Sequence, residues 1–358
     1  MPQYQVFDQE DKIVETTKVT TGYFSDAGGI LEGSDMVTQS LTASQDQYYA
    51  NIKKGTTGTK DEFSITFGNR PGSGSADVTG HTKAIYQYFA DLLLFPDEIE
   101  TVGFQFNSGS TEDNIWILSA ERAQMKDRLN RKNWTLTLSG STFGDGTHTA
   151  DQSTGSKLEL TDDSAYSAAT PTPAGNRYNI ISGTVGTGYN GGGTGSFYAA
   201  GHPYGWIYPS MGLIVLNGTA LSASIPGHDV ASGSSVTADT GRGVGFGLDT
   251  ATTAANHMKL FHTLKSGSFQ ARSEEDQITT SYFVRARAAH WNFSNNPSFF
   301  SGSDATFSIT EFTGNPQTFI TTVGLHDAQG TMVAVGRLST PVLKNFSTEF
   351  TAKVNLVH

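Results

Sequence analysis

The stretch Glu62-Phe63-Ser64-Ile65-Thr66-Phe67 alternates polar and apolar residues without a break. Successive side chains of a β-strand point to opposite faces of a sheet, so Phe63, Ile65 and Phe67 would share one buried face. Similar short runs of Thr, Val, Phe and Tyr, broken by Gly, Asn, Asp or Pro, recur along the chain and predict further strands. We expect them at 13–21, 101–106, 114–119, 134–138, 178–185, 281–289, 305–312, 318–324, 332–338 and 346–356.

Two segments have the spacing of short amphipathic helices instead. In 82–95, apolar residues recur at helical intervals and Pro96 follows as a stop signal. In 251–265, a second apolar stripe ends shortly before Gly267. The apolar positions are Ile85, Tyr88, Phe89, Leu92 and Leu93 in the first helix, and Ala254, Met258, Leu260, Phe261 and Leu264 in the second. Each helix is expected to cover a sheet face.

Many strands at short spacing predict a mainly β protein, with β-sandwich or partly open barrel domains. Long loops rich in Gly, Ser or Thr separate them, at 70–80, 144–155, 161–177, 186–195 and 231–247. The tight connection 326–330 predicts a hairpin between its flanking strands. We expect a β-rich domain with one helix at 1–143, a loop-rich β insertion or middle domain at 144–250, and a helix plus a five-stranded β domain at 251–358.

Composition excludes several functions. The net charge of −11 disfavours a general nucleic-acid binder or a protein of anionic membrane surfaces, because both need a basic footprint. The absence of cysteine excludes disulfides, zinc–thiolate sites and Fe–S clusters. No apolar run approaches the roughly 20 residues that span a bilayer. The beginning Met1-Pro2-Gln3-Tyr4 lacks the features of a secretory signal, which predicts synthesis in a cytoplasm.

One basic segment, residues 122–132, holds five of the 23 cationic residues: Arg122, Lys126, Arg128, Arg131 and Lys132. It is either a docking patch for an acidic protein surface or nucleic acid, or a solvated turn whose charges pair locally with Glu121 and Asp127. The solvated turn is the commoner role of such a segment; if the segment does dock, a protein surface fits an isolated patch on an acidic chain better than nucleic acid. Trp134, Trp206 and Tyr208 are added as candidate docking residues. The acidic run Glu274-Glu275-Asp276 is expected to be a solvated face.

Motifs for catalysis, cofactor binding or metal binding are weak in this sequence. The G-x-G-x-x-G match at 186–191 lacks a following helix, so a flexible loop is the better interpretation. His257 and His262 are five residues apart, which is not the i, i+4 spacing of a zinc site. No carboxylate pair, nucleophile elbow or phosphate loop can be named. We therefore predict no catalytic residue, no cofactor, no metal and no enzymatic activity.

Several segments carry a resemblance to a known class of proteins. They are Lys18-Val19-Thr20-Thr21-Gly22-Tyr23-Phe24-Ser25, 120–134, Ile207-Tyr208-Pro209-Ser210-Met211-Gly212-Leu213-Ile214-Val215-Leu216-Asn217, Phe293-Ser294-Asn295-Asn296-Pro297-Ser298-Phe299, 315–325, Ala334-Val335-Gly336-Arg337-Leu338-Ser339 and 341–342. Together they resemble virion structural proteins of large contractile-tailed phages, especially the T4-like phages of marine cyanobacteria. The likeness touches most of the chain and fails mainly in the loops at 144–195 and 226–250.

The resemblance implies an assembly component of the tail or baseplate, with the neck or capsid surface as other possible places. Its expected partners are other virion structural proteins and symmetric copies of itself, without nucleic acid or membrane. Its expected location is the virion. Two alternatives stay open. Aromatic residues near glycines, such as Phe197-Tyr198 and 204–208, would suit a host-surface adhesin or carbohydrate-binding module, although plugging a seam between loop and sheet is their commoner role. The second alternative is a polysaccharide depolymerase, which is supported only by the number of Asp and Glu residues in the chain.

Overall fold

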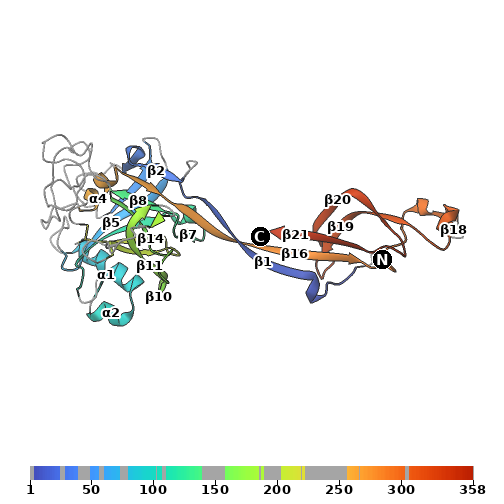
Figure 1. The fold of residues 1–358 in the computed structure, drawn as a ribbon, viewed down its shortest axis with the longest axis horizontal. Coiled ribbons are helices and arrows are strands. Elements are labelled where there is room, and N and C mark those ends of the chain that lie inside the picture. Colours follow the sequence, from blue (N-terminus) through green and yellow to red (C-terminus); the bar gives the residue numbers. More distant parts are fainter. Residues whose placement is uncertain are drawn as a thin grey trace. The chain divides into compact units, whose positions relative to one another are not determined.

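The computed structural model consists of two compact units, which are described one at a time (Figure 1). The barrel unit comprises residues 19–275, and the terminal unit comprises residues 1–18 and 276–358. The residues that the structure describes are 4–24, 29–38, 49–55, 60–72, 80–101, 103–106, 110–138, 158–184, 187–188, 203–218, 220–221, 256–265, 267–302 and 306–357. Strands account for 52% and helices for 16%, so the predicted mainly β class is confirmed. The expected domain boundaries at 143/144 and 250/251 lie outside the described residues.

The barrel unit is built on one antiparallel sheet whose main path has eleven strands and is nearly closed. In spatial order they are β2 (Ile30–Glu32), β15 (Ser268–Gln270), β8 (Thr135–Leu138), β9 (Leu158–Asp162), β11 (Gly175–Thr184), β13 (Gly205–Tyr208), β14 (Leu213–Asn217), β6 (Asn114–Ala120), β5 (Asp61–Asn69), β4 (Tyr49–Lys54) and β3 (Met36–Thr38). The two end strands, β2 and β3, are joined by a single 3-10 turn, Gly33–Asp35. This short link brings the ends of the sheet together.

Both faces of this sheet are covered, as the alternation of β6 shows. Trp116 and Leu118 belong to one hydrophobic core, which also contains Phe63, Ile65 and Phe67 of β5 as predicted. Ile115 and Ile117 belong to a second core on the other face. Because both faces of the sheet are covered by apolar residues, every residue of β13 and β14 is buried.

The two predicted helices are present, with one helix on each core. Helix α1 (His81–Leu93) contributes Tyr86, Ala90 and Leu93 to the second core, and α4 (Asn256–Lys265) contributes Leu260, Phe261 and Leu264 to the first. The prediction placed Tyr88 on the buried side of α1, and this was wrong, because Tyr88 is 63% exposed. Residues 251–255 lie outside the described part.

Some local predictions were wrong for identifiable reasons. Helix α1 does end at Leu93, before Pro96, as predicted. Not predicted was that Pro96 also begins a further helix, α2 (Pro96–Thr101), since proline is tolerated in the first turn of a helix. Within the expected strand 101–106, Thr101 ends α2 and residues 103–106 form no strand. The expected loop 161–177 contains β10 (Thr170–Thr172), which pairs with β11. The expected strand 305–312 forms only β18 (Thr306–Phe307) and the 3-10 turn Thr310–Phe312. A short α3 (Arg122–Met125) was not expected.

The terminal unit is made of narrow sheets. Strands β1 (Lys12–Gly22) and β16 (Arg272–Ala286) each have residues in both units, and β21 (Phe350–Val357) pairs with the second half of β16. Strands β19 (Thr318–His326) and β20 (Met332–Lys344) form the predicted hairpin, and β17 (Phe300–Ser301) pairs with β18. The hairpin turn is closed by Asp327, whose Oδ1 accepts hydrogen bonds from the backbone N–H of Gln329 and Thr331.

Candidate docking surfaces

The predicted basic segment is fixed to neighbouring strands of the barrel unit by its backbone. It contains α3 and β7 (Arg128–Leu129), and β7 pairs with the first residues of β16, so that Arg128 lies opposite Glu274. The N–H of Leu129 donates to the carbonyl of Pro209 (3.0 Å), and the N–H of Asn130 donates to the carbonyl of Arg272 (2.7 Å). The segment is therefore part of the sheet framework rather than a free turn.

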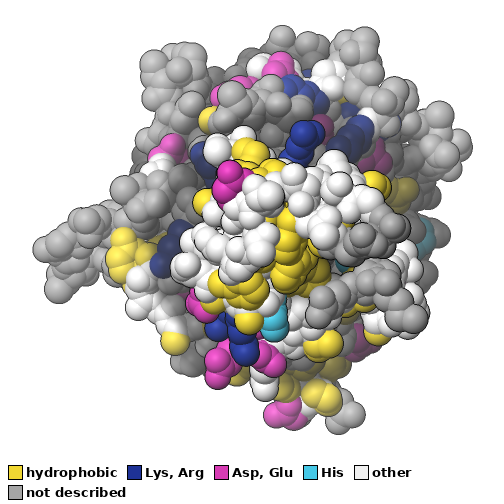
Figure 2. All heavy atoms as spheres, turned by 90° about the vertical axis from the view of Figure 1, so that its right-hand side faces the viewer, with side chains coloured by type: hydrophobic (Ala, Val, Ile, Leu, Met, Phe, Trp, Pro, Cys, Tyr) yellow, Lys and Arg dark blue, Asp and Glu magenta, His cyan; other side chains and the backbone are white. Residues whose placement is uncertain are grey.

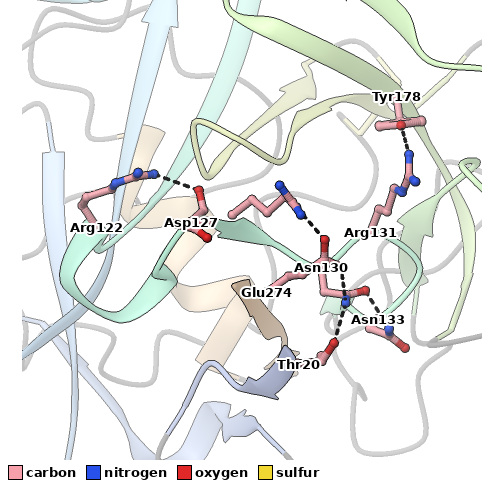
Figure 3. Close-up of polar contacts among 9 residues, drawn as sticks. Thr20, Arg122, Asp127, Asn130, Arg131, Asn133, Tyr178 and Glu274 are labelled. Atoms are coloured by element: carbon pink, nitrogen blue, oxygen red, sulfur yellow. Dashed lines mark hydrogen bonds and ion pairs between the residues drawn. The ribbon is translucent and has the colours of Figure 1, made fainter. Parts of the chain in front are cut away.

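Side chains of this segment pair with the acidic run at the start of β16 (Figure 3). The Arg128 Nε lies 2.6 Å from Oε1 of Glu274, and Asn130 Nδ2 donates to Oε2 of the same carboxylate at 2.8 Å. Lys126 Nζ forms an ion pair with Glu275. The Glu274 side chain is only 11% exposed, so the prediction of a solvated acidic face was wrong for this residue. The two charged runs singled out in the sequence are partners of each other.

The remaining cations of the segment have different surroundings. The guanidinium of Arg122 donates to the backbone carbonyls of Asp127 and Ser210, both at 3.2 Å. Arg131 donates to the hydroxyl of Tyr178, and its guanidinium carbon lies 5.6 Å from the centre of that ring. Lys132 is exposed, and its backbone N–H donates to the Asp162 carboxylate. Arg122, Arg131 and Lys132 stay candidates for docking, whereas Arg128 has an internal structural role.

The three aromatic docking candidates are not on the surface. Trp134 and Tyr208 are fully buried and Trp206 is 4% exposed. Trp134 belongs to the first core and donates its indole N–H to Asp162 at 2.6 Å, while Trp206 and Tyr208 belong to the second core. The prediction that these three residues contact a partner is therefore corrected, because their rings pack inside the barrel unit. Phe197 and Tyr198 lie outside the described residues.

The terminal unit presents a large apolar surface instead. Its buried apolar residues among those described are Ala286, Val323 and Leu325. Fifteen of the twenty exposed large apolar residues of the described chain belong to it: Tyr4, Val6, Ile13, Val14, Ile278, Trp291, Phe293, Ile309, Phe319, Met332, Val333, Val335, Leu343, Phe346 and Val357. Figure 2 views the end of this unit that carries β18, where hydrophobic side chains lie among uncharged ones. Such a surface is unusual for a protein that functions alone.

The outer face of the β19–β20 hairpin is the most regular part of this surface. Phe319 lies opposite Leu343 across the two strands, and Val335 lies opposite Gly324. A bulge between Ile320 and Thr322 interrupts the alternation, so Val323 and Leu325 are buried. We call the exposed residues of the hairpin, namely Phe319, Met332, Val333, Val335 and Leu343, the hairpin strip.

A phenylalanine cluster lies beside β17 and β18 in the same unit. Phe299 contacts the rings of Phe300, Phe307 and Phe312 with centres 5.1–5.7 Å apart, and Phe293 stacks on Phe307 at 6.1 Å. All five of these rings keep some solvent exposure. These rings contact each other and are exposed or half-buried, not fully buried, among the described residues.

Sequence reasoning did not identify this surface, although one signal pointed to it. Met332-Val333-Ala334-Val335 is a run of four apolar residues in a strand. Because alternate side chains of a strand face opposite sides, such a run makes both faces apolar. Ala334 lies opposite the buried Leu325, whereas Val333 and Val335 are exposed, and so is Met332, which follows a second register shift in the hairpin.

The described residues give little support to a catalytic or metal-binding function. They contain no group of three or more His, Cys, Asp or Glu side chains that could hold a metal ion. Lys344 is fully buried, and its ammonium donates to the carbonyls of Ala288 and Asn345 and to Oδ1 of Asn292, all within 2.9 Å. Burial lowers the pKa of Lys344, which the nearby charge of Glu349 partly offsets. None of the described helices is long and apolar enough to cross a membrane.

Comparisons with known proteins give no relative: no family model, no curated protein and no solved structure matches this chain. The function is therefore inferred from the burial, charge and contacts of its own residues. Of these, the apolar surface of the terminal unit is the most specific feature.

Proposed function

We propose that this protein is a non-enzymatic structural subunit of a phage virion, placed in the tail or baseplate, that acts through protein–protein contacts in a symmetric assembly. The observation that carries the proposal is the distribution of apolar residues in the terminal unit. It has three buried apolar residues and fifteen exposed large ones among its described positions. A partner surface would bury the apolar side chains that the unit itself leaves exposed to water.

Physical chemistry supports an assembly role for such a unit. Removing apolar surface from water stabilises a structure by about 25 cal/mol per Å². An isolated two-stranded hairpin is marginal in water and needs a third strand or a hydrophobic cover. The β19–β20 hairpin pairs with no further strand among the described residues. Docking onto a neighbour would supply the cover.

The resemblance to phage virion proteins supports the proposal at the same place in the chain. Its C-terminal segments are 293–299, 315–325, 334–339 and 341–342. These segments contribute residues to the phenylalanine cluster and to both strands of the hairpin. Phe319 and Val335 of the hairpin strip, and Phe293 and Phe299 of the phenylalanine cluster, lie in these segments.

The two alternatives receive less support. The described aromatic residues that suggested a carbohydrate-binding module, Tyr204, Trp206 and Tyr208, are buried. A depolymerase needs two carboxylates facing a substrate, and the described contacts place Glu274 and Asp162 in internal hydrogen bonds instead. Neither observation favours a second function over assembly.

Mass spectrometry of purified particles of the phage that encodes this chain tests the proposal. We expect the chain in a constant ratio to the major capsid subunit, unchanged after a high-salt wash and a second density gradient. A cryo-electron reconstruction should then place its terminal unit against neighbouring subunits. Absence from washed particles, or release of reducing sugars from host polysaccharide by the purified protein, would contradict it.

A further inference from the structure

The hairpin strip has a partner that the structure allows us to name. We propose that a second copy of this chain covers it, with the outer faces of two β19–β20 hairpins packed antiparallel around a two-fold axis. This inference rests on the proposed function, because it names the partner of the same surface. The Phe319–Leu343 end of each hairpin would then meet the Val333–Val335 end of the other.

The strip supplies more than half of the area that each partner contributes to a standard interface. Phe319, Val333 and Val335 are each at least 60% exposed, and Met332 is 56% exposed. At roughly 100 Å² of accessible surface for each side chain, the five residues offer about 500 Å² per copy. The uncharged neighbours Thr322 and Gly324 extend the face toward the roughly 800 Å² per partner of a standard interface.

The charge of the terminal unit also favours a second copy of this chain over a strongly charged partner protein. The terminal unit carries nine acidic and seven basic residues, a net charge of −2, whereas the whole chain carries −11. The outer face of the hairpin has one charged residue, Arg337, opposite Thr322. A face with a single charge offers no pattern that selects an oppositely charged protein, and its one like-charged pair in a dimer, Arg337 with Arg337, is on long flexible side chains.

Symmetry makes one surface sufficient for this contact. In a two-fold dimer the same patch is used by both subunits, so it must be self-complementary. The strip has large side chains at both ends, and its middle is the Thr322–Arg337 pair. Antiparallel packing matches the two apolar ends and leaves the flexible Arg337 side chain able to reach solvent at the edge.

Sedimentation of the full-length protein over a range of concentrations tests the inference. We expect the wild type to dimerise, and the double variant Phe319→Asp, Val335→Asp to dissociate at least about tenfold more readily, since an apolar contact is lost at each end of the strip. The matched control is Tyr88→Asp on α1, which has the same 63% exposure as Phe319 but lies in the barrel unit. It should leave the dimer unchanged. A wild type that stays monomeric at every concentration overturns the inference.

A cross-link gives a second measurement that does not depend on a destabilising charge. The chain has no cysteine, so the single variant Thr322→Cys provides one thiol at the middle of the strip. Mild oxidation should give a covalent dimer with Thr322→Cys and none with Tyr88→Cys. Equal yields from both would contradict the two-fold contact.

The two proposals fail in different ways. A chain that is found in particles but is monomeric and not cross-linked retains the virion role and loses the second copy. In that case a different virion protein covers the strip. A chain that dimerises through Thr322 but is absent from washed particles keeps the dimer and loses the virion role.

Discussion

The barrel unit and the terminal unit use the same kind of strand but bury its side chains very differently. In the barrel, β6 sends Trp116 into one core and Ile117 into another, because a closed sheet and two helices provide a layer on each face. In the terminal unit, β20 and β21 alternate between half-buried and exposed residues along most of their length. The difference teaches that strand pairing alone does not make a core: a second layer does.

The terminal unit holds its few buried positions partly with polar groups. The Arg285 guanidinium lies 2.8 Å from the buried Asp11 carboxylate, and Lys344 is surrounded by three oxygen acceptors. Hydrogen bonds fix geometry without needing a thick apolar layer. This arrangement leaves the apolar side chains outside, where an assembly partner can use them.

The largest expected effect separates an apolar residue of the barrel from one of the terminal unit. Trp116→Ala should cost about 3–5 kcal/mol, because it removes a fully buried ring and the hydrogen bond from Nε1 to the carbonyl of Asn256. Phe319→Ala should change stability by less than about 0.5 kcal/mol at protein concentrations too low for association. Urea unfolding followed by tryptophan fluorescence measures both. Equal losses would break the comparison.

Alkaline pH should unfold the barrel first. Burial raises the pKa of Tyr86 and of Tyr208 to about 12, and Tyr204 and Tyr23 are shifted in the same direction. A raised folded-state pKa gives stability that is complete below pH 10 and is lost as the pH rises from 10 to 12, since the unfolded chain releases the proton first. Circular dichroism against pH should show this transition.

The variant Tyr208→Phe keeps the ring and removes one titrating group, so its transition should move to higher pH. The same substitution at the exposed Tyr88 should leave the transition where it is in the wild type. A Tyr208→Phe transition at the wild-type pH would show that this phenol does not drive the alkaline unfolding.

The next effect in size concerns the buried amine of the terminal unit. Lys344→Met should cost at least about 2 kcal/mol, because three oxygen acceptors lose a charged donor. The matched control is Lys353→Met on β21, whose side chain is exposed. Hydrogen exchange should rise around Ala288 and the end of β20 in the first variant alone. Unchanged exchange there would mean that Lys344 does not hold the unit together.

Local alternation made much of the fold predictable. Glu62–Phe67 places its apolar residues on one face in the structure as in the sequence, and α1 and the β19–β20 hairpin follow from helical spacing and a short turn. Closure of the barrel was not predictable, because it depends on pairing between β2 and β15, which are more than 230 residues apart. Pro96 shows a different limit: the same residue can end one helix or begin the next.

The docking surface was harder to predict than the fold. The sequence suggests Trp206 and Tyr208 as docking residues only because they are aromatic. An aromatic residue in a sequence does not indicate whether other residues will bury it, and both of these are buried. Arg128 and Lys126 were chosen for their charge, and their acidic partners lie almost 150 residues away. In contrast, the continuous apolar run Met332-Val333-Ala334-Val335 indicates that β20 has apolar residues on its exposed side as well as on its packed side.

The smallest expected effect decides whether the basic segment is a structural contact or a surface for a partner. Glu274→Gln should cost about 1–2 kcal/mol, because its carboxylate accepts hydrogen bonds from Arg128 and Asn130 in a nearly buried position. Glu275→Gln should cost less than about 0.5 kcal/mol, since Glu275 and Lys126 are each more than a third exposed, and 0.5 M salt should remove most of this small effect. Urea unfolding of the two adjacent variants provides the measurement, with each residue as the control for the other. If both substitutions cost equally little, the contact between Arg128 and Glu274 does not hold the barrel together. Arg128 would then join Arg122, Arg131 and Lys132 as a docking candidate, and the contrast between the two units would be weaker.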